Sequence, residues 1–374
     1  MKIAVNTRLL IKNKLDGIGW FTFETLRRIT VNHPDVEFYF LFDRAYDQSF
    51  IFGPNVTPVV LNPPARHPVL FVIWFEWSVK QALKKIKPDL FLSPDGYLSL
   101  STKYKSLAVM HDLNFEHFPK DLPWLVRWYY RYFFPRFAKK ATRIATVSEF
   151  SKSDIINQYD VSTDKIDVIY NGVNDLFKPI SISQTEMVRK KYTGGCPYFI
   201  FVGSLHPRKN LARLFGAFDQ FKKSGPDTKL LVVGEKKWWT KEIESKYNAM
   251  TFKEEVVFCG RLKAEDLHLV TAAALATTYV SYFEGFGIPI IESFRCGVPV
   301  ITSNITSMPE VAGDAALLVD PFDEGSISRA MTAIVSDERL REELIQKGFE
   351  RARLFNWDNT ATQLWNSIVK TLNN

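Results

Sequence analysis

The sequence predicts an α/β protein of two domains, each built on a parallel sheet covered by helices. Short apolar runs alternate with longer amphipathic stretches from one end of the chain to the other. Such alternation is typical of parallel strands joined by right-handed crossovers. The length of 374 residues is generous for one domain of this kind and comfortable for two.

The order of the elements follows from where the apolar runs lie. In the first half we expect strands at residues 3–8, 37–42, 58–61, 89–93, 107–111, 144–148 and 166–170. The helices between them are expected at residues 20–31, 72–87, 123–140 and 150–159. In the second half we expect strands at 198–202, 230–234, 256–259, 277–281, 299–302 and 316–319, with helices that include 211–223 and 264–276.

The alternation breaks once, in the polar stretch KPISISQTEMVRKKYTGG. We place the linker between domains there, which gives an N-terminal domain over residues 1–180 and a C-terminal domain over 190–356. Both are expected to be doubly wound, Rossmann-like sheets. Because such folds bind ligands at the carboxyl ends of their strands, we expect the two sheets to face a common cleft.

Charge and composition restrict the partners and the compartment. The net charge of +7 favours a polyanionic partner, but no nucleic-acid module is recognisable, so we expect no nucleic-acid binding. The N-terminus lacks the regions of a signal peptide, and the longest apolar run, residues 69–75, is far too short to span a bilayer. Three cysteines lack metal-ligand spacing. We expect a cytoplasmic protein, free or peripheral on the inner face of the cytoplasmic membrane.

The segment EGFGIPIIE carries the most chemical information. It follows a strand, and Gly285 and Gly287 permit a tight turn that leads into a helix. The free N–H groups and the dipole of that helix start suit a diphosphate. Glu284 at the strand end and Glu292 one turn into the helix can each accept hydrogen bonds from vicinal hydroxyls. The alternative is that both glutamates only complement the helix dipole.

A second segment, YFIFVGSLHPRKNL, places two cations after a strand. Arg208 and Lys209 precede a helix that begins near Asn210, which we expect to act as its N-cap. Adjacent Arg and Lys side chains can hold a diphosphate and neutralise it as it leaves. The chain has no Asp-x-Asp pair, so we expect that no metal carries the diphosphate. We also expect no cofactor. A solvated pair of charges at a helix start is the alternative.

Two segments of the N-terminal half give weaker signals. Gly17 and Gly19 lie between the first strand and the first helix, but the pattern is only Gly-x-Gly, and a structural turn explains it as well. His111 and Asp112 sit at the carboxyl end of a strand, where a ligand would bind, although a lone histidine is often structural.

Taken together, the chain resembles the retaining glycosyltransferases of family 4, which have the GT-B fold. The resemblance extends from Gly17 to the terminal helix. It is carried by the segments GIGWF, VMHDLNFEHFP, TVSEFSKSDI, VIYNGV, VGSLHPRKN, FCGRL and the stretch from EGFGIPIIE through GVPVITSNITSMPEVAGDAALLVDP.

The resemblance implies a role for each of the candidate site residues. Glu284 would hold the hydroxyls of the donor sugar and Glu292 the ribose. Arg208 and Lys209 would hold the diphosphate, and His111 would lie near the transferred sugar. The remaining donor-binding positions are Gly17, Gly19, Ser204, Arg261, Leu262, Gly285, Phe286, Gly287 and Ile288. The terminal helix, 357–374, would pack back on the N-terminal domain.

One position departs from the pattern of the family. Many members carry Arg immediately after the glycine that corresponds to Gly203, and this chain has Ser204. Arg208 would then supply the missing charge, and which of Arg208 and Lys209 carries the diphosphate stays open.

These features together predict a retaining hexosyltransferase. It would move a sugar, mannose from GDP-mannose being favoured, from a nucleoside diphosphate to a glycan or lipid-linked glycan, without a metal and by front-face substitution. Two alternatives remain: a nucleotide-sugar epimerase on the same fold and a non-catalytic protein that binds sugar nucleotides or polyanions. A dinucleotide-dependent dehydrogenase is disfavoured because no strand is followed by G-x-G-x-x-G.

The stretch WLVRWYYRYFFPRFAKKATR combines aromatic and basic residues and has no acidic one. A helix of this composition can lie on an anionic membrane surface and present a lipid-linked acceptor. The alternative is that its aromatic residues pack on the sheet while Lys and Arg are solvated.

Overall fold

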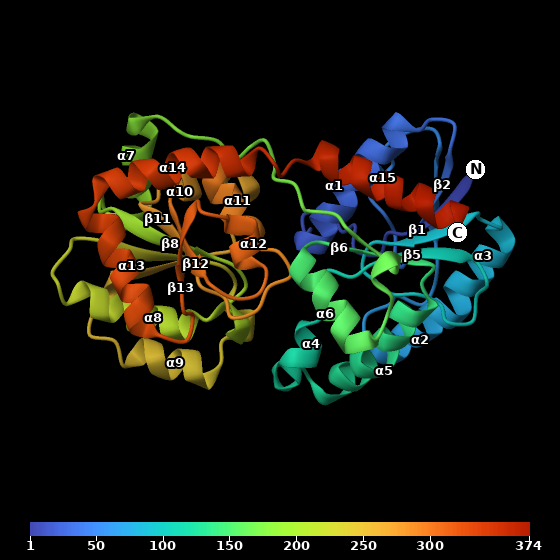
Figure 1. Cartoon of the computed structure of the whole chain (residues 1–374), viewed down its shortest axis with the longest axis horizontal. Helices are drawn as coiled ribbons and strands as arrows, with labels where there is room; N and C mark the ends of the chain where they lie inside the picture. The colour runs from blue at the N-terminus through green and yellow to red at the C-terminus, as the bar shows by residue number, and fades with distance from the viewer. The chain divides into compact units, whose positions relative to one another are not determined.

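The computed structural model describes all 374 residues, and they form two units (Figure 1). The first comprises Met1–Gly172 together with Trp357–Asn374, and the second comprises Val173–Asn356. Each unit has its own parallel sheet and its own core.

The first unit contains a seven-stranded sheet in the order β3-β2-β1-β4-β5-β6-β7, with every neighbouring pair parallel. Its strands are β1 (Lys2–Asn6), β2 (Glu37–Phe42), β3 (Val56–Val60), β4 (Leu90–Ser93), β5 (Lys105–Val109), β6 (Arg143–Thr146) and β7 (Ile166–Val168). The strand order reverses at β1, which lies between β2 and β4. A point of reversal is where doubly wound sheets bind ligands, at the carboxyl ends of the strands.

Helices cover both faces of this sheet. They are α1 (Gly17–Asn32), α2 (Pro68–Ile73), α3 (Lys80–Ile86), α4 (Asn114–His117), α5 (Trp124–Lys140), α6 (Glu149–Tyr159) and α15 (Trp357–Asn373), and a π-helical segment, η2 (Trp74–Val79), joins α2 to α3. Hydrophobic side chains of β1 and β4 alternate between two cores: Ala4 and Phe91 lie in one, while Ile3 and Leu92 lie in the other.

The terminal helix α15 lies beside α1 and contributes to the core under it (Figure 1). Trp357 packs edge-on against Phe21, with ring centroids 6.5 Å apart, and Trp365 stacks on His33 at 3.6 Å. Arg28 of α1 pairs with Asp358 at 2.5 Å. The last helix of the chain is therefore part of the first unit, although the whole second unit separates them in sequence.

The second unit contains a six-stranded parallel sheet in the order β10-β9-β8-β11-β12-β13. Its strands are β8 (Tyr198–Val202), β9 (Lys229–Val233), β10 (Val256–Gly260), β11 (Ala276–Tyr279), β12 (Val300–Ser303) and β13 (Ala316–Val319). Its helices are α7 (Ile182–Thr193), α8 (Leu211–Lys222), α9 (Lys241–Asn248), α10 (Ala264–Ala272), α11 (Ile288–Arg295), α12 (Met308–Ala312), α13 (Glu324–Ser336) and α14 (Glu338–Ala352). The sequence analysis did not place α7, α9, α13 or α14.

The segment expected to be a linker is largely helical, which corrects that prediction. Helix α7 begins with a capping box, in which Ser181 Oγ accepts from the Gln184 N–H and the Gln184 side chain accepts from the Ser181 N–H. Arg189 donates to the Ala273 carbonyl at 3.1 Å, which joins α7 to the second unit. That unit begins at Val173, so residues 173–180 cluster with it and not with the N-terminal domain in which we expected them.

Among the helices of either unit, none combines the length and the hydrophobicity that crossing a bilayer requires.

Candidate functional site

Neighbouring strands of the second sheet bring the two most informative segments together. Strand β8 precedes Arg208 and Lys209, strand β11 precedes Glu284, and the two strands pair in parallel. Arg208 Nη1 lies 2.6 Å from Glu284 Oε2, and Lys209 Nζ lies 2.5 Å from Glu284 Oε1. The predicted diphosphate-binding cations thus flank the carboxylate predicted to hold the sugar.

Buried charges within this group set the ionisation of the carboxylate. Burial by itself raises the pKa of Glu284, but Arg208 and Lys209 more than offset it and lower the pKa to about 2. Lys209 also contacts the Tyr279 hydroxyl at 2.6 Å, and burial raises the pKa of that phenol, so the tyrosine stays neutral. The group therefore holds two cations and one carboxylate.

The loop after Glu284 is held by a buried serine. Ser307 Oγ donates to the carbonyls of Glu284 and Phe286, at 2.9 and 3.1 Å. Gly287 has a φ of 106°, a conformation that favours glycine, and it is followed by α11. No side chain caps α11, so the positive end of its dipole is open to an anion. Ile288 and Pro289 are the first residues of this helix.

Glu292 differs from Glu284 in having no partner. It lies in the second turn of α11, half-buried, and no hydrogen bond or ion pair reaches its carboxylate. Burial raises the pKa of Glu292 to about 8. A partly buried carboxyl group without a donor can accept hydrogen bonds from the hydroxyls of a ligand at little cost.

The role predicted for Asn210 was wrong. The residue precedes α8, but it has a φ of 63° and its side chain makes no cap. Its Nδ2 instead donates to the carbonyls of Val280 and Pro321, at 3.0 and 2.6 Å. The side chain therefore joins the segment that carries the two cations to the residues after β11 and β13.

The other donor-side positions lie at carboxyl strand ends but not in this charge group. Ser204 is exposed just after β8. Arg261 and Leu262 follow β10, which β9 separates from β8. Arg261 is exposed and Leu262 is half-buried.

In the first unit, the structure brings the start of α1 close to His111. Gly17 is the first residue of α1, and the N–H of Gly19 donates to the Asp16 side chain at 2.9 Å, which caps the helix. The ring of Phe21, one turn further, lies edge-on to the His111 ring at 5.1 Å. The Gly-x-Gly turn and His111, far apart in sequence, thus belong to one region.

His111 has a defined tautomer. Its Nε2 lies 2.8 Å from the Pro94 carbonyl, and a carbonyl can only accept, so Nε2 carries the proton. Burial lowers the pKa of His111, which keeps the ring neutral. Nδ1 is then an acceptor that a hydroxyl group of a ligand could use.

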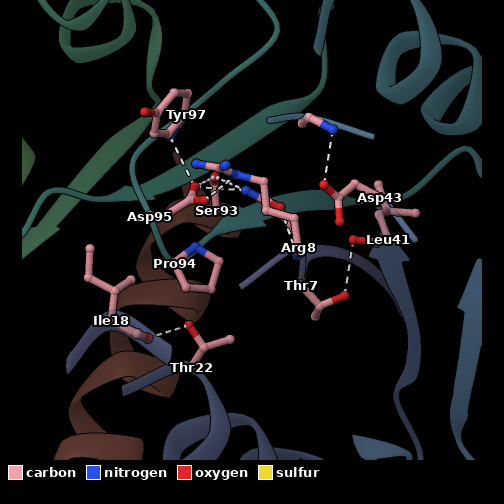
Figure 2. Close-up of polar contacts among 12 residues, drawn as sticks. Thr7, Arg8, Ile18, Thr22, Leu41, Asp43, Ser93, Pro94, Asp95 and Tyr97 are labelled. Carbon is pink, nitrogen blue, oxygen red and sulfur yellow. Dashed lines mark hydrogen bonds and ion pairs between the residues drawn. The ribbon is translucent and has the colours of Figure 1, made fainter. Parts of the chain in front are cut away.

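The sequence analysis missed a buried charge pair beside Pro94 (Figure 2). Arg8, just after β1, donates through Nε to Asp95 Oδ2 at 2.7 Å, and both side chains are more than nine-tenths buried. Asp95 Oδ1 also accepts from Asn6 Nδ2 at 2.7 Å, and the Arg8 guanidinium lies over the Tyr97 ring at 4.4 Å. Burial by itself lowers the pKa of Arg8, but the neighbouring Asp95 carboxylate more than offsets this, so the pKa of Arg8 is raised. The sequence did contain a signal for this pair, because the polar residues Arg8 and Asp95 follow the strands β1 and β4.

Nowhere in the chain do three or more His, Cys, Asp or Glu side chains gather closely enough to hold a metal ion.

Comparisons with known proteins agree with this architecture. Residues 16–175 match the family model "Glycosyltransferase Family 4", and residues 184–351 match "Glycosyl transferases group 1". The chain is similar to the O-antigen chain mannosyltransferase B of Escherichia coli, with 30% identity over 98% of this chain and 99% of the relative. It is also similar to the O-antigen chain mannosyltransferase RfbU of Salmonella typhimurium, with 26% identity over 85% of this chain and 84% of the relative.

A solved structure supports the fold. The sucrose-phosphate synthase from Thermosynechococcus elongatus superposes with a TM-score of 0.80 over 99% of this chain and 98% of that one, at 19% identity. Two parallel α/β sheets, two family models that together cover most of the chain, and a relative of 30% identity over nearly its whole length lead to one conclusion. The chain belongs to the family-4, group 1 glycosyltransferases, a retaining family with the GT-B fold.

Proposed function

We propose that this glycosyltransferase moves a mannosyl group, with retention, from GDP-mannose to a glycan or lipid-linked glycan of a bacterial surface polysaccharide. The choice of mannose is supported by the two relatives described above, both of which are mannosyltransferases of the O-antigen chain.

The observation that carries the proposal is the charge group around Glu284. Two cations contact one carboxylate, and α11, whose start no side chain caps, begins after the loop of residues 285–287 that follows Glu284. Arg208 and Lys209 would hold the diphosphate, and Glu284 would then turn to the hydroxyls of the donor sugar. Glu292, which has no partner, would accept the ribose hydroxyls.

The chemistry that these residues support is a front-face substitution. The bond from the anomeric carbon to the β-phosphate oxygen breaks, and the acceptor oxygen forms its new bond on the same face. The leaving phosphate takes up the proton of the acceptor hydroxyl. Arg208, Lys209 and the amides of the helix start would stabilise the charge that develops on this phosphate, and no metal ion takes part.

His111 has a separate role in this proposal. With Nε2–H donated to the Pro94 carbonyl, its Nδ1 would accept a hydrogen bond from a hydroxyl of the transferred sugar. Gly17 and Gly19, at the start of the neighbouring helix, would lie near the diphosphate and the acceptor.

The test has two steps. A thermal-shift screen of GDP, UDP, dTDP and their sugars should show the largest rise in Tm with GDP and GDP-mannose, because selective binding stabilises the folded state. Incubation with GDP-mannose and a polyprenyl-linked oligosaccharide should then yield an α-linked product, with equal yield in EDTA. If a nucleotide other than GDP were the only one to raise the Tm, the donor would have to be assigned to that nucleotide. Loss of activity in EDTA that magnesium restores would contradict the metal-free mechanism. An altered sugar nucleotide formed without acceptor would indicate an epimerase.

A further inference from the structure

A buried tyrosine of the second unit contacts two parts of the candidate diphosphate site. Tyr279 is the last residue of β11 and is 2% exposed. Its hydroxyl lies 2.6 Å from Lys209 Nζ. A Cβ at position 287, where the chain has glycine, would lie 3.4 Å from Tyr279 Cε1, so the ring packs against the turn that starts α11. One side chain therefore touches both the lysine and the turn before the helix start.

Hydrogen bonds fix the main chain at Tyr279 and at Lys209. Thr302 Oγ1 donates to the Tyr279 carbonyl at 2.8 Å, which ties the end of β11 to β12. Asn210 Nδ2 donates to the Val280 carbonyl at 3.0 Å, and these two residues directly follow Lys209 and Tyr279 in the chain. The lysine and the tyrosine side chains therefore start from main-chain positions that the sheet holds in place.

The side chain of Lys209 is packed along its whole length. It is only 10% exposed. A Cβ at Gly203, just after β8, would lie 3.6 Å from both Cδ and Cε of Lys209, so the aliphatic stem runs over this glycine. The ammonium nitrogen lies 4.8 Å from the centre of the Tyr279 ring. Stem and ammonium group are thus packed against the ends of two neighbouring strands.

Two oxygen atoms approach the Lys209 ammonium, and they differ in kind. Glu284 Oε1 lies 2.5 Å from Nζ, but this contact lacks the geometry of a hydrogen bond. Nζ donates instead to the Tyr279 hydroxyl. Burial, and next the Glu284 carboxylate, raise the pKa of Tyr279 well above its usual range, so the hydroxyl is neutral. An ammonium group has three N–H donors, and a bond to a neutral oxygen uses one without cancelling the charge.

We propose that Tyr279 is a positioning residue for Lys209, whose ammonium group its hydroxyl holds for the leaving diphosphate. This role rests on the proposed function, because it concerns the same diphosphate. Without the hydroxyl, the ammonium group would be drawn closer to the Glu284 carboxylate, and less of its charge would act on the phosphate. A fixed cation matters most in the transition state, when negative charge develops on the leaving group.

Other roles of Tyr279 lead to different expectations. A general acid or base must exchange a proton near neutral pH, and the raised pKa of Tyr279 keeps the proton on the phenol. The remaining alternative is that the hydroxyl only satisfies a buried lysine. It would then contribute to the free energy of unfolding and would leave turnover unchanged.

The variant Tyr279→Phe tests the proposal, because it removes the hydroxyl and keeps the ring. We expect kcat to fall by about 10–100-fold, the range for a lost hydrogen bond to a charged group, while the KM of the donor changes by less than about threefold. In the background of Lys209→Ala, the same change should lower kcat no further, since the tyrosine acts through the lysine. The full chain is assayed with the donor that the thermal-shift screen selects.

Tyr198→Phe is the matched control. Tyr198 is the first residue of β8, at the end of the strand away from the site, and it is fully buried. Its hydroxyl donates to the Val270 carbonyl, also at 2.6 Å. Both variants should lower the Tm, because each loses a buried hydrogen bond. Only Tyr279→Phe should lower kcat.

Inorganic pyrophosphate gives a measurement that does not depend on turnover. It carries the terminal charge that the leaving diphosphate acquires. In isothermal titration it should bind Tyr279→Phe on the order of tenfold more weakly than it binds the wild-type protein and Tyr198→Phe.

Several results would overturn the role of Tyr279. One is a wild-type kcat in Tyr279→Phe, and another is an equal fall of kcat in Tyr198→Phe. A further fall in the double variant would mean that the tyrosine acts independently of Lys209. Wild-type protein that binds neither pyrophosphate nor any nucleoside diphosphate would overturn the diphosphate site and this role with it. Turnover with a donor other than GDP-mannose would change the proposed function, and the expectations for Tyr279 would stand with that donor.

Discussion

Each unit buries a cation against a carboxylate near the carboxyl ends of its strands, but the two groups differ in the number of cations that contact the carboxylate. In the first unit, Arg8 pairs with Asp95, and Asn6, Ser93 and the main chain supply the other donors to that carboxylate. In the second unit, Arg208 and Lys209 share the single carboxylate of Glu284. The first group is neutral and its carboxylate is fully used. In the second group, two cations meet at the same carboxylate.

The difference teaches how to separate a structural ion pair from a binding site when both are buried. A neutral pair whose carboxylate accepts from several donors of its own unit gains little from a ligand. Two cations that converge on one carboxylate repel each other, and an anionic ligand that binds between them relieves this repulsion. The number of cations at the carboxylate therefore distinguishes the two groups better than burial does.

The largest effect is expected where the neutral pair is broken. Asp95→Asn leaves the Arg8 guanidinium buried without a carboxylate, and we expect the chain to lose about 3–5 kcal/mol in its free energy of unfolding. Urea denaturation measures this loss. Arg8→Met combined with Asp95→Leu should restore most of it, because the buried charge is then absent. Asp95→Asn with wild-type stability would show that the pair is not structural.

The second unit should respond in activity. Lys209→Ala removes one of the two cations that contact Glu284, and we expect kcat to fall by roughly 10²–10³, on the scale of a lost oxyanion donor. Initial rates at saturating donor measure the effect. Lys246→Ala, which removes the exposed partner of Glu324 in the same unit, should leave kcat unchanged. Wild-type turnover in Lys209→Ala would remove that residue from the mechanism.

A smaller effect should follow when the shared carboxylate is removed. Glu284→Ala should lower kcat by about 10–100-fold through the loss of charge-assisted hydrogen bonds to the sugar. The affinity for GDP alone should stay the same or increase, since Arg208 and Lys209 are then released for the diphosphate. Isothermal titration with GDP and steady-state rates separate these contributions. Weaker binding of GDP would mean that Glu284 holds the nucleotide.

The last expected effect is a gradual dependence of stability on pH, and it concerns Glu292, the carboxyl group without a partner. Its pKa is raised by burial from 4.5 to about 8, so the folded chain keeps a proton that the unfolded chain loses above pH 4.5. Its contribution to stability is thus present at low pH and is lost as the pH rises from 4.5 to 8, by at most about 1.4 kcal/mol per pH unit. Glu292→Gln should remove this slope in urea denaturation. The same slope in both proteins would show that another group causes it.

Local patterns in the sequence were enough for most of the fold. The predicted strands at residues 37–42 and 198–202 have the bounds of β2 and β8, and the predicted helix at 123–140 differs from α5 by one residue. Helix α7 was missed although Ser181 and Gln184 form a capping box, because a polar composition was taken as a sign of a linker. The mistake lay in the interpretation, since the local signal was present.

The sequence by itself determined the alternation of elements, the family resemblance and the positions of Glu284, Arg208 and Lys209 after their strands. Only the tertiary structure decided which of these side chains meet. Arg208 and Glu284 are 76 residues apart, and they are in contact because β8 and β11 are neighbours in the sheet. Arg8 and Asp95 meet in the same way because β1 lies beside β4. Periodicity is a property of consecutive residues, whereas the pairing of charges depends on strand order, which is set by the packing of the whole unit.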